Sequence, residues 1–170
     1  MASIAKFDTW QNTGGVNRQT PLQVIQSTLT SQFETNATTV DFSWSVTITP
    51  SSSSNKILIS MHSFSFLIRD VADSACKMWL ERSIGGGGFT KIQSPANYLG
   101  QGGDGSNGSE ETYPNMMFLD SPATTSAVTY KITGQKNGSG NGGNVAWNHN
   151  NSDPGDTAKK ATLIAMEISQ

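Results

Sequence analysis

The residues of this chain that could do acid–base, nucleophilic or metal chemistry are few and scattered. The sequence has two histidines and one cysteine. His62 falls within an expected strand and His149 within a loop, so the two lack the spacing of metal ligands. Cys76 stands alone, which excludes a disulfide framework and leaves any zinc site without paired thiolates. Glu110 and Glu111 are adjacent, as in a solvated turn, and are not placed like paired catalytic acids. From these residues together we expect no enzyme, no metal and no cofactor.

Three loops rich in Asn, Gly and Ser hold the remaining polar side chains, and they span 100–111, 136–143 and 148–156. Such loops, flanked by aromatic rings, suit sugars and adaptable protein contacts, although solvated loops on a stable domain are the simpler interpretation. The oxygen-bearing residues of 104–110 resemble calcium ligands, but their spacing departs from the EF-hand pattern and the final bidentate acid is missing. The candidate binding residues of this loop surface are Tyr98, Asp104, Asn107, Tyr113, Trp147 and His149.

The elements that position these loops are β-strands. From 38 to 48, five apolar residues alternate with polar ones, which places the two kinds on opposite faces of a strand. The apolar set is Val40, Phe42, Trp44, Val46 and Ile48. Pro50 ends the run, Ser51 to Asn55 form a turn, and a second apolar run follows at 57–59, so the stretch predicts a half-buried β-hairpin.

The segment from 56 to 68 changes the parity of its apolar residues partway. Odd positions are apolar up to Met61 and even positions from Phe64 onward. A bulge near His62 and Ser63 would keep both sets on the core side, and a strand covered on both faces by a neighbouring subunit is the alternative. Trp79 falls on the polar side of the strand over 75–82. His62 and Trp79 are therefore candidate subunit-interface residues.

Composition and length indicate one domain with a β architecture. The 170 residues are only 14% charged, and the net charge of −2 with dispersed Lys and Arg argues against nucleic-acid binding. The sequence has no apolar run of the ~20 residues needed to cross a membrane, and its first ten residues lack the apolar core of a secretory signal. About eight short strands separated by turn signals predict an antiparallel β-sandwich, specifically a jelly roll, over 22–170.

Residues 1–21 differ from the rest and are predicted to form a short N-terminal arm. Phe7 and Trp10 are large aromatic residues on a polar leader, as in the anchor of a docking segment. An arm that packs on its own domain is the alternative.

Several segments of the chain resemble small virion proteins and fibre-tip domains of marine and cyanobacterial tailed bacteriophages. The similar segments are ASIAKFDTWQNTGGVNRQTPLQVIQ, VTITPSSSSNKILI, FLDSPATTSAVTYKI and ATLIAMEIS, which span the frame of the chain but not its long loops. The resemblance implies a trimeric jelly roll, similar in outline to complement-globular and tumour-necrosis-factor type heads, on the outside of the particle. It brings no catalytic or cofactor residues.

The leading hypothesis is a homotrimeric tail-fibre or receptor-binding tip that docks through its arm to other virion proteins and touches a host surface glycan or protein. A capsid decoration protein is the alternative, and a free carbohydrate-binding lectin is a third. The expected location is the virion, assembled in the reducing host cytoplasm, which agrees with a single cysteine.

Overall fold

The computed structural model describes residues 21–35, 37–68, 75–99, 110–137, 145–149 and 160–170. Across these ranges the chain forms twelve β-strands and no helix, which confirms the predicted all-β class. Accordingly, no helix long and apolar enough to cross a membrane occurs in the described ranges. The predicted arm is almost wholly outside these ranges, and the first strand begins at Pro21.

The strands form two main antiparallel sheets and one small sheet. Sheet I contains, in spatial order, β1 (Pro21–Leu29), β12 (Ala161–Ile168), β4 (Lys56–His62) and β9 (Met116–Asp120). Sheet II contains β3 (Thr39–Ile48), β10 (Val128–Asn137), β6 (Ala75–Ile84) and β7 (Thr90–Leu99). The small sheet contains β2 (Phe33–Thr35), β11 (Val145–Trp147), β5 (Phe66–Ile68) and β8 (Glu110–Thr112).

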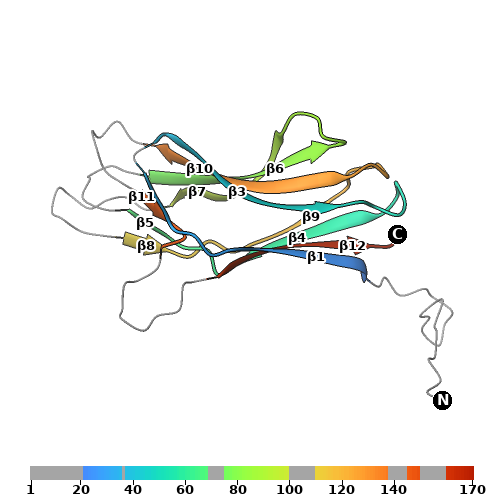
Figure 1. The fold of residues 1–170 in the computed structure, drawn as a ribbon, viewed down its shortest axis with the longest axis horizontal. Coiled ribbons are helices and arrows are strands. Elements are labelled where there is room, and N and C mark those ends of the chain that lie inside the picture. Colours follow the sequence, from blue (N-terminus) through green and yellow to red (C-terminus); the bar gives the residue numbers. More distant parts are fainter. Residues whose placement is uncertain (1–20, 36, 69–74, 100–109, 138–144, 150–159) are drawn as a thin grey trace, which may run out of the picture.

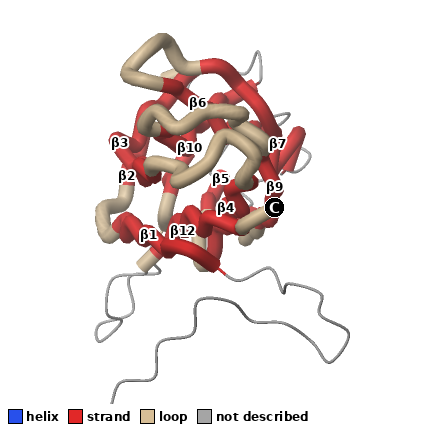
Figure 2. Tube along the Cα trace, turned by 90° about the vertical axis from the view of Figure 1, so that its right-hand side faces the viewer, coloured by secondary structure: helices blue, strands red, loops and turns tan. Residues whose placement is uncertain are grey.

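The small sheet repeats the strand order of sheet I, because β2 follows β1, β5 follows β4, β8 precedes β9 and β11 precedes β12 along the chain. The twelve strands therefore reduce to eight longer ones, each of those four pairs being counted as one. The first of the eight pairs with the last, the second with the seventh, the third with the sixth and the fourth with the fifth. This nested pairing, wrapped into two layers, is the jelly roll that the sequence predicts (Figures 1 and 2).

Strand β3 has the alternating burial that its sequence predicts. The apolar residues from Val40 to Ile48 are at most 8% exposed, and the polar residues between them are exposed. The predicted β-hairpin over Thr38–Ile59 is wrong, however. β3 pairs with β10 of sheet II, whereas β4 pairs with β12 and β9 of sheet I. The turn after Pro50 thus carries the chain from one sheet to the other, because local alternation selects an inner face but no partner strand.

The parity change after β4 falls at a break between two strands and not at a bulge within one strand, although the break has the effect on the core that the sequence predicts for a bulge. β4 ends at His62, Ser63 has a φ of 59°, and β5 begins at Phe66. Met61 and Phe64 are both fully buried on either side of this irregularity. The residues between the two strands rotate the chain so that odd positions before the break and even positions after it face the same core.

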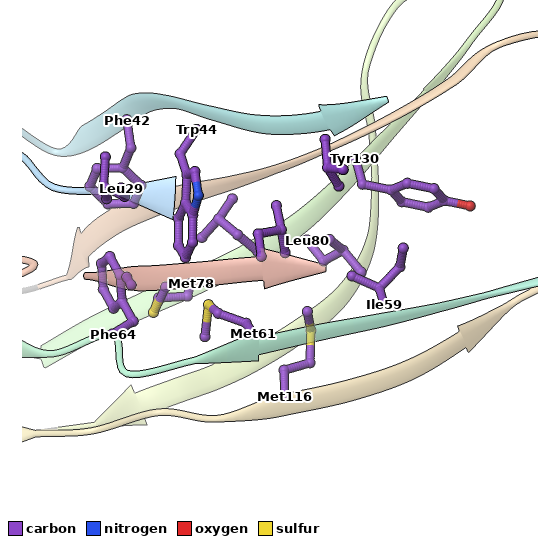
Figure 3. Packing of buried hydrophobic residues seen from close by; sticks show 14 of the residues in the cluster. Leu29, Phe42, Trp44, Ile59, Met61, Phe64, Met78, Leu80, Met116 and Tyr130 are labelled. Atoms are coloured by element: carbon purple, nitrogen blue, oxygen red, sulfur yellow. The ribbon is translucent and has the colours of Figure 1, made fainter. Parts of the chain in front are cut away.

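Aromatic rings fill one end of the core between the two layers (Figure 3). Trp44 stacks on Phe64 with ring centroids 5.7 Å apart, and Phe42 contacts both Phe64 and Trp147. Gly134 of β10 lies against this group, and a Cβ there would meet the Phe42 ring at 2.8 Å and the Trp147 ring at 2.9 Å. A residue without a side chain is therefore needed for the rings to pack this closely.

Candidate functional site

Two of the predicted loop-surface residues are buried, and the prediction that they form part of a binding surface is corrected. Trp147 is 0% exposed, and its ring lies 5.5 Å from that of Phe42 and 5.6 Å from that of Phe66. His149 is 5% exposed, and its carbonyl accepts a hydrogen bond from Ser65 Oγ. The start of the third polar loop thus completes the core, because the small sheet needs β11 between β2 and β5.

The structure describes little else of the predicted loop surface. The Tyr113 side chain is 54% exposed and so lies on the surface, as predicted. Tyr98 belongs to β7, but its side chain is outside the described residues. Asp104, Asn107 and the arm residues Phe7 and Trp10 are also outside them, so their assigned roles stay predictions.

The most densely hydrogen-bonded carboxylate of the described residues is Glu167, which faces inward near the end of β12. Its Oε1 accepts hydrogen bonds from the Ser51 backbone N–H at 2.6 Å, Ser51 Oγ at 2.8 Å and Asn55 Nδ2 at 2.7 Å. Its Oε2 accepts one from Gln23 Nε2 at 2.6 Å. Burial alone would raise the pKa of Glu167, but these donors stabilise the ionised form and bring the pKa to about 2. This carboxylate joins β1, the β3–β4 turn and β12.

A second polar cluster joins the two sheets at Asp120. Arg82 Nη1 of sheet II donates to both carboxylate oxygens of Asp120 in sheet I, at 2.7 and 2.9 Å. Tyr130 Oη donates to Asp120 Oδ2 at 2.7 Å, and burial together with this bond raises the pKa of Tyr130. The tyrosine therefore stays protonated as a hydrogen-bond donor. The cluster holds the layers together across the sandwich.

The cysteine and the remaining acid beside a hollow are, respectively, buried and paired. Cys76 is fully buried, and burial raises the pKa of its thiol to about 12 although Lys136 lowers it. No group of three or more potential metal-binding side chains occurs in the described ranges. A hollow of ≈470 Å³ beside Phe33 includes Asp41, but the Lys131 ammonium binds that carboxylate at 2.8 Å and lowers its pKa. That acid is ionised and paired.

The outer face of sheet II is polar and internally bonded. Lys131 pairs with Asp41 at 2.8 Å and lies 3.7 Å from Glu81, and Thr133 Oγ1 donates to Glu81 at 3.1 Å. The half-buried Trp79 extends this network, because its Nε1 donates to Gln135 and the Lys91 ammonium lies over its ring at 4.4 Å. The polar side chains named here thus find their hydrogen-bond and ion-pair partners within the same chain.

The outer face of sheet I is the opposite in character. Its outward positions carry eight large apolar side chains, which we call the apolar face: Leu22, Val24, Leu58, Met117, Leu119, Ile164, Met166 and Ile168. Met117 is 71% exposed, Val24 52% and Leu119 50%. Val24, Met166, Leu58 and Leu119 are directly opposite one another across the four strands and form one continuous apolar row.

Sequence reasoning missed this face, although a signal was present. The inner positions of β12 are buried and its outer positions are half-buried, yet both are largely apolar. The run LIAM from Leu163 to Met166 and the run MMFL from Met116 to Leu119 are continuous rather than alternating. Continuous apolar strands are typical of sheets covered on both sides.

The two predicted interface residues lie on different faces. His62 is exposed at the end of β4, on the same side of sheet I as the apolar face. Trp79 points outward from β6 in sheet II. One flat contact surface therefore cannot include both side chains.

No protein-family model matches this sequence, and no curated protein matches it. Among solved structures, the chain is similar to the infectious bursal disease virus VP2 subviral particle, with a TM-score of 0.40 and 14% identity over 99% of this chain. The structure of the infectious bursal disease virus Gt strain is similar with a TM-score of 0.37 and 12% identity. This chain spans 44% and 42% of the length of those two chains.

Proposed function

We propose that this chain is a bacteriophage virion structural protein without catalytic activity. In this proposal it is a homotrimeric tail-fibre or receptor-binding tip subunit that docks to other virion proteins through residues 1–21. The observation that carries the proposal is the contrast between the two outer faces of the sandwich, as far as the described residues show them. One face is polar and internally bonded, and the other carries exposed and half-buried apolar side chains. A chain with one such face is suited to be a subunit of an assembly.

The way in which the described polar groups are used supports a structural role. Glu167 and Asp120 connect elements of the sandwich, and the Asp41 carboxylate is paired with Lys131. Groups engaged in this way stabilise a rigid scaffold, on which the loops and the arm would make contacts with other molecules. Such a protein functions by binding other molecules: the arm binds the particle, and the distal loops contact a host surface glycan or protein.

The test is the copy number of this chain in purified particles, measured by quantitative mass spectrometry against the major capsid protein. A few trimers per particle support the tail position. Hundreds of copies would instead assign the chain to the capsid as a decoration protein. Absence from particles that are otherwise complete would overturn both, and binding of the isolated protein to a glycan array would then favour a free lectin.

Deletion of residues 1–20 tests the arm separately. The truncated chain keeps every described strand, since β1 begins at Pro21. We expect it to fold and to be lost from the particle. A second variant changes only Phe7 and Trp10 to Ala. It should lose most of its incorporation into the particle if those rings are the anchors. Normal incorporation of the truncated chain would disprove the docking role.

A further inference from the structure

We propose that the apolar face of sheet I is the contact surface between copies of this chain. The inference rests on the proposed role as an assembly subunit and adds the location of the contact and the identity of its occupant. It is independent of whether the assembly belongs to a tail or a capsid.

The size of the apolar face fits a subunit contact. The outer side of sheet I has four strands spaced ~4.8 Å apart, and β12 is eight residues long, so that side measures ~19 Å by ~26 Å, or about 500 Å² in projection. The apolar face occupies the part of this area that lies toward the C-terminal end of β12. The relief of the side chains makes the accessible area larger. A stable interface buries roughly 800 Å² on each partner, so the apolar face would form the centre of a contact that also includes the polar residues around it.

The charge distribution favours a second copy over a lipid surface. Of the outward positions in sheet I, only Lys56 carries a formal charge, and it lies at one end of the sheet. Binding to an anionic bilayer needs a cluster of basic residues, and interfacial anchoring favours Trp and Tyr, neither of which is present at these positions. Two copies of an almost uncharged face approach without repulsion, whereas the ion-paired face of sheet II would lose its hydration.

The arrangement of the apolar face points the same way. Ser60 lies within it, between Ile164 and Met117, and the polar row of Thr28, Thr162 and His62 borders it on one side. A largely apolar surface with a polar margin is the anatomy of an interface between protein subunits. Met117 and Met166 add side chains that adapt to the facing surface.

The experiment uses the full-length chain and places one negative charge at either end of the apolar row. Val24→Glu and Leu119→Glu are at positions 52% and 50% exposed, so neither change disturbs the core. Ser45→Glu is the matched control, because Ser45 is exposed on the outer face of sheet II opposite Lys131. The readout is molar mass by light scattering across a dilution series, with near-ultraviolet circular dichroism as the check on folding.

We expect the wild type and Ser45→Glu to share one oligomeric mass, which for a trimer of 18.1 kDa chains is about 54 kDa. Both variants of the apolar row should stay folded. They should dissociate at protein concentrations at least 100-fold higher than the wild type does, because each copy would bury an unpaired carboxylate. A dimeric wild type whose two apolar-row variants dissociate would support the apolar face and contradict the proposed trimer, whereas a dimer that persists in both variants would overturn the face. A trimer that persists in both variants would overturn the face while leaving the trimer intact, and a monomeric wild type would overturn the inference outright.

Discussion

Asn55 and Glu167 are 112 residues apart in the chain, yet the Asn55 side-chain amide donates a hydrogen bond to Glu167 Oε1 at 2.7 Å. This bond connects the turn between the two sheets to the last strand. Gln23 of β1 donates to the other carboxylate oxygen of Glu167, so three distant parts of the chain meet at one side chain. One ionised side chain thus connects β1, the turn between the sheets and β12.

Glu167 should make the stability of the protein fall in acid. The pKa of its carboxyl is about 2 in the folded chain and has an ordinary value of 4.5. A group whose pKa is depressed by folding contributes stability that is fully present above its ordinary value and is lost as the pH falls through that value toward the folded one. Urea unfolding between pH 6 and pH 2 should show this loss. The Glu167→Gln variant should be less stable by about 1–2 kcal/mol at pH 6 and should show a flatter profile below pH 4.5. Parallel profiles for the two proteins would contradict the assignment.

Asp120 should contribute more to stability than Asp41, although both are paired with a cation. The side chain of Asp120 is 8% exposed and that of Asp41 is 53% exposed. Asp120→Ala leaves Arg82 and Tyr130 without their shared acceptor, and we expect a loss of about 3 kcal/mol in the free energy of unfolding. Asp41→Ala, the control, breaks an ion pair at the surface and should cost less than about 1 kcal/mol. If guanidinium unfolding showed equal losses of free energy for Asp120→Ala and Asp41→Ala, the Asp120 cluster would contribute no more to stability than a surface ion pair.

Gly134 should not tolerate a methyl group. The Cβ of Gly134→Ala would lie 2.8 Å from Phe42 and 2.9 Å from Trp147, and both rings are held by the surrounding core. Overpacking of this kind should cost about 1–3 kcal/mol and shift the near-ultraviolet spectrum of the tryptophans. The matched control is Gly88→Ala in the β6–β7 hairpin, where no atom lies within 4 Å of the added Cβ. Its stability should stay within about 0.5 kcal/mol of the wild type.

Cys76 should be inert in the folded protein. It is fully buried, and the pKa of its thiol is about 12, so almost no thiolate forms at neutral pH. A thiol reagent such as Ellman's should react with less than one-tenth of the chains in native buffer and with all of them in denaturant. Rapid labelling of the native protein would mean that β6 opens locally.

Much of the fold could be predicted because alternation is a local property of the sequence. Val40 to Ile48 alternate with polar residues, and this pattern alone indicates a strand and selects its inner side. The parity change near His62 predicts a bulge, and the structure has an irregularity at that place, although it is a break between β4 and β5. The break keeps Met61 and Phe64 in one core. These inferences depend on neighbours a few residues away, which the sequence lists in order.

The interaction surfaces depended on contacts that are distant in sequence, and only the tertiary structure decided them. Trp147 flanks the third polar loop in the sequence and is predicted to lie on the loop surface, but it is buried because β2 and β5 are the neighbours of its strand in the small sheet. Val24 and Leu119 read as strand residues of no special kind, and they become the two ends of one apolar row once β12 and β4 lie between them. The sequence by itself determined which residues form strands and which side of β3 faces inward. Strand pairing, which joins segments from 55 to 147 residues apart in sheet I, decided which apolar side chains meet on one outer face.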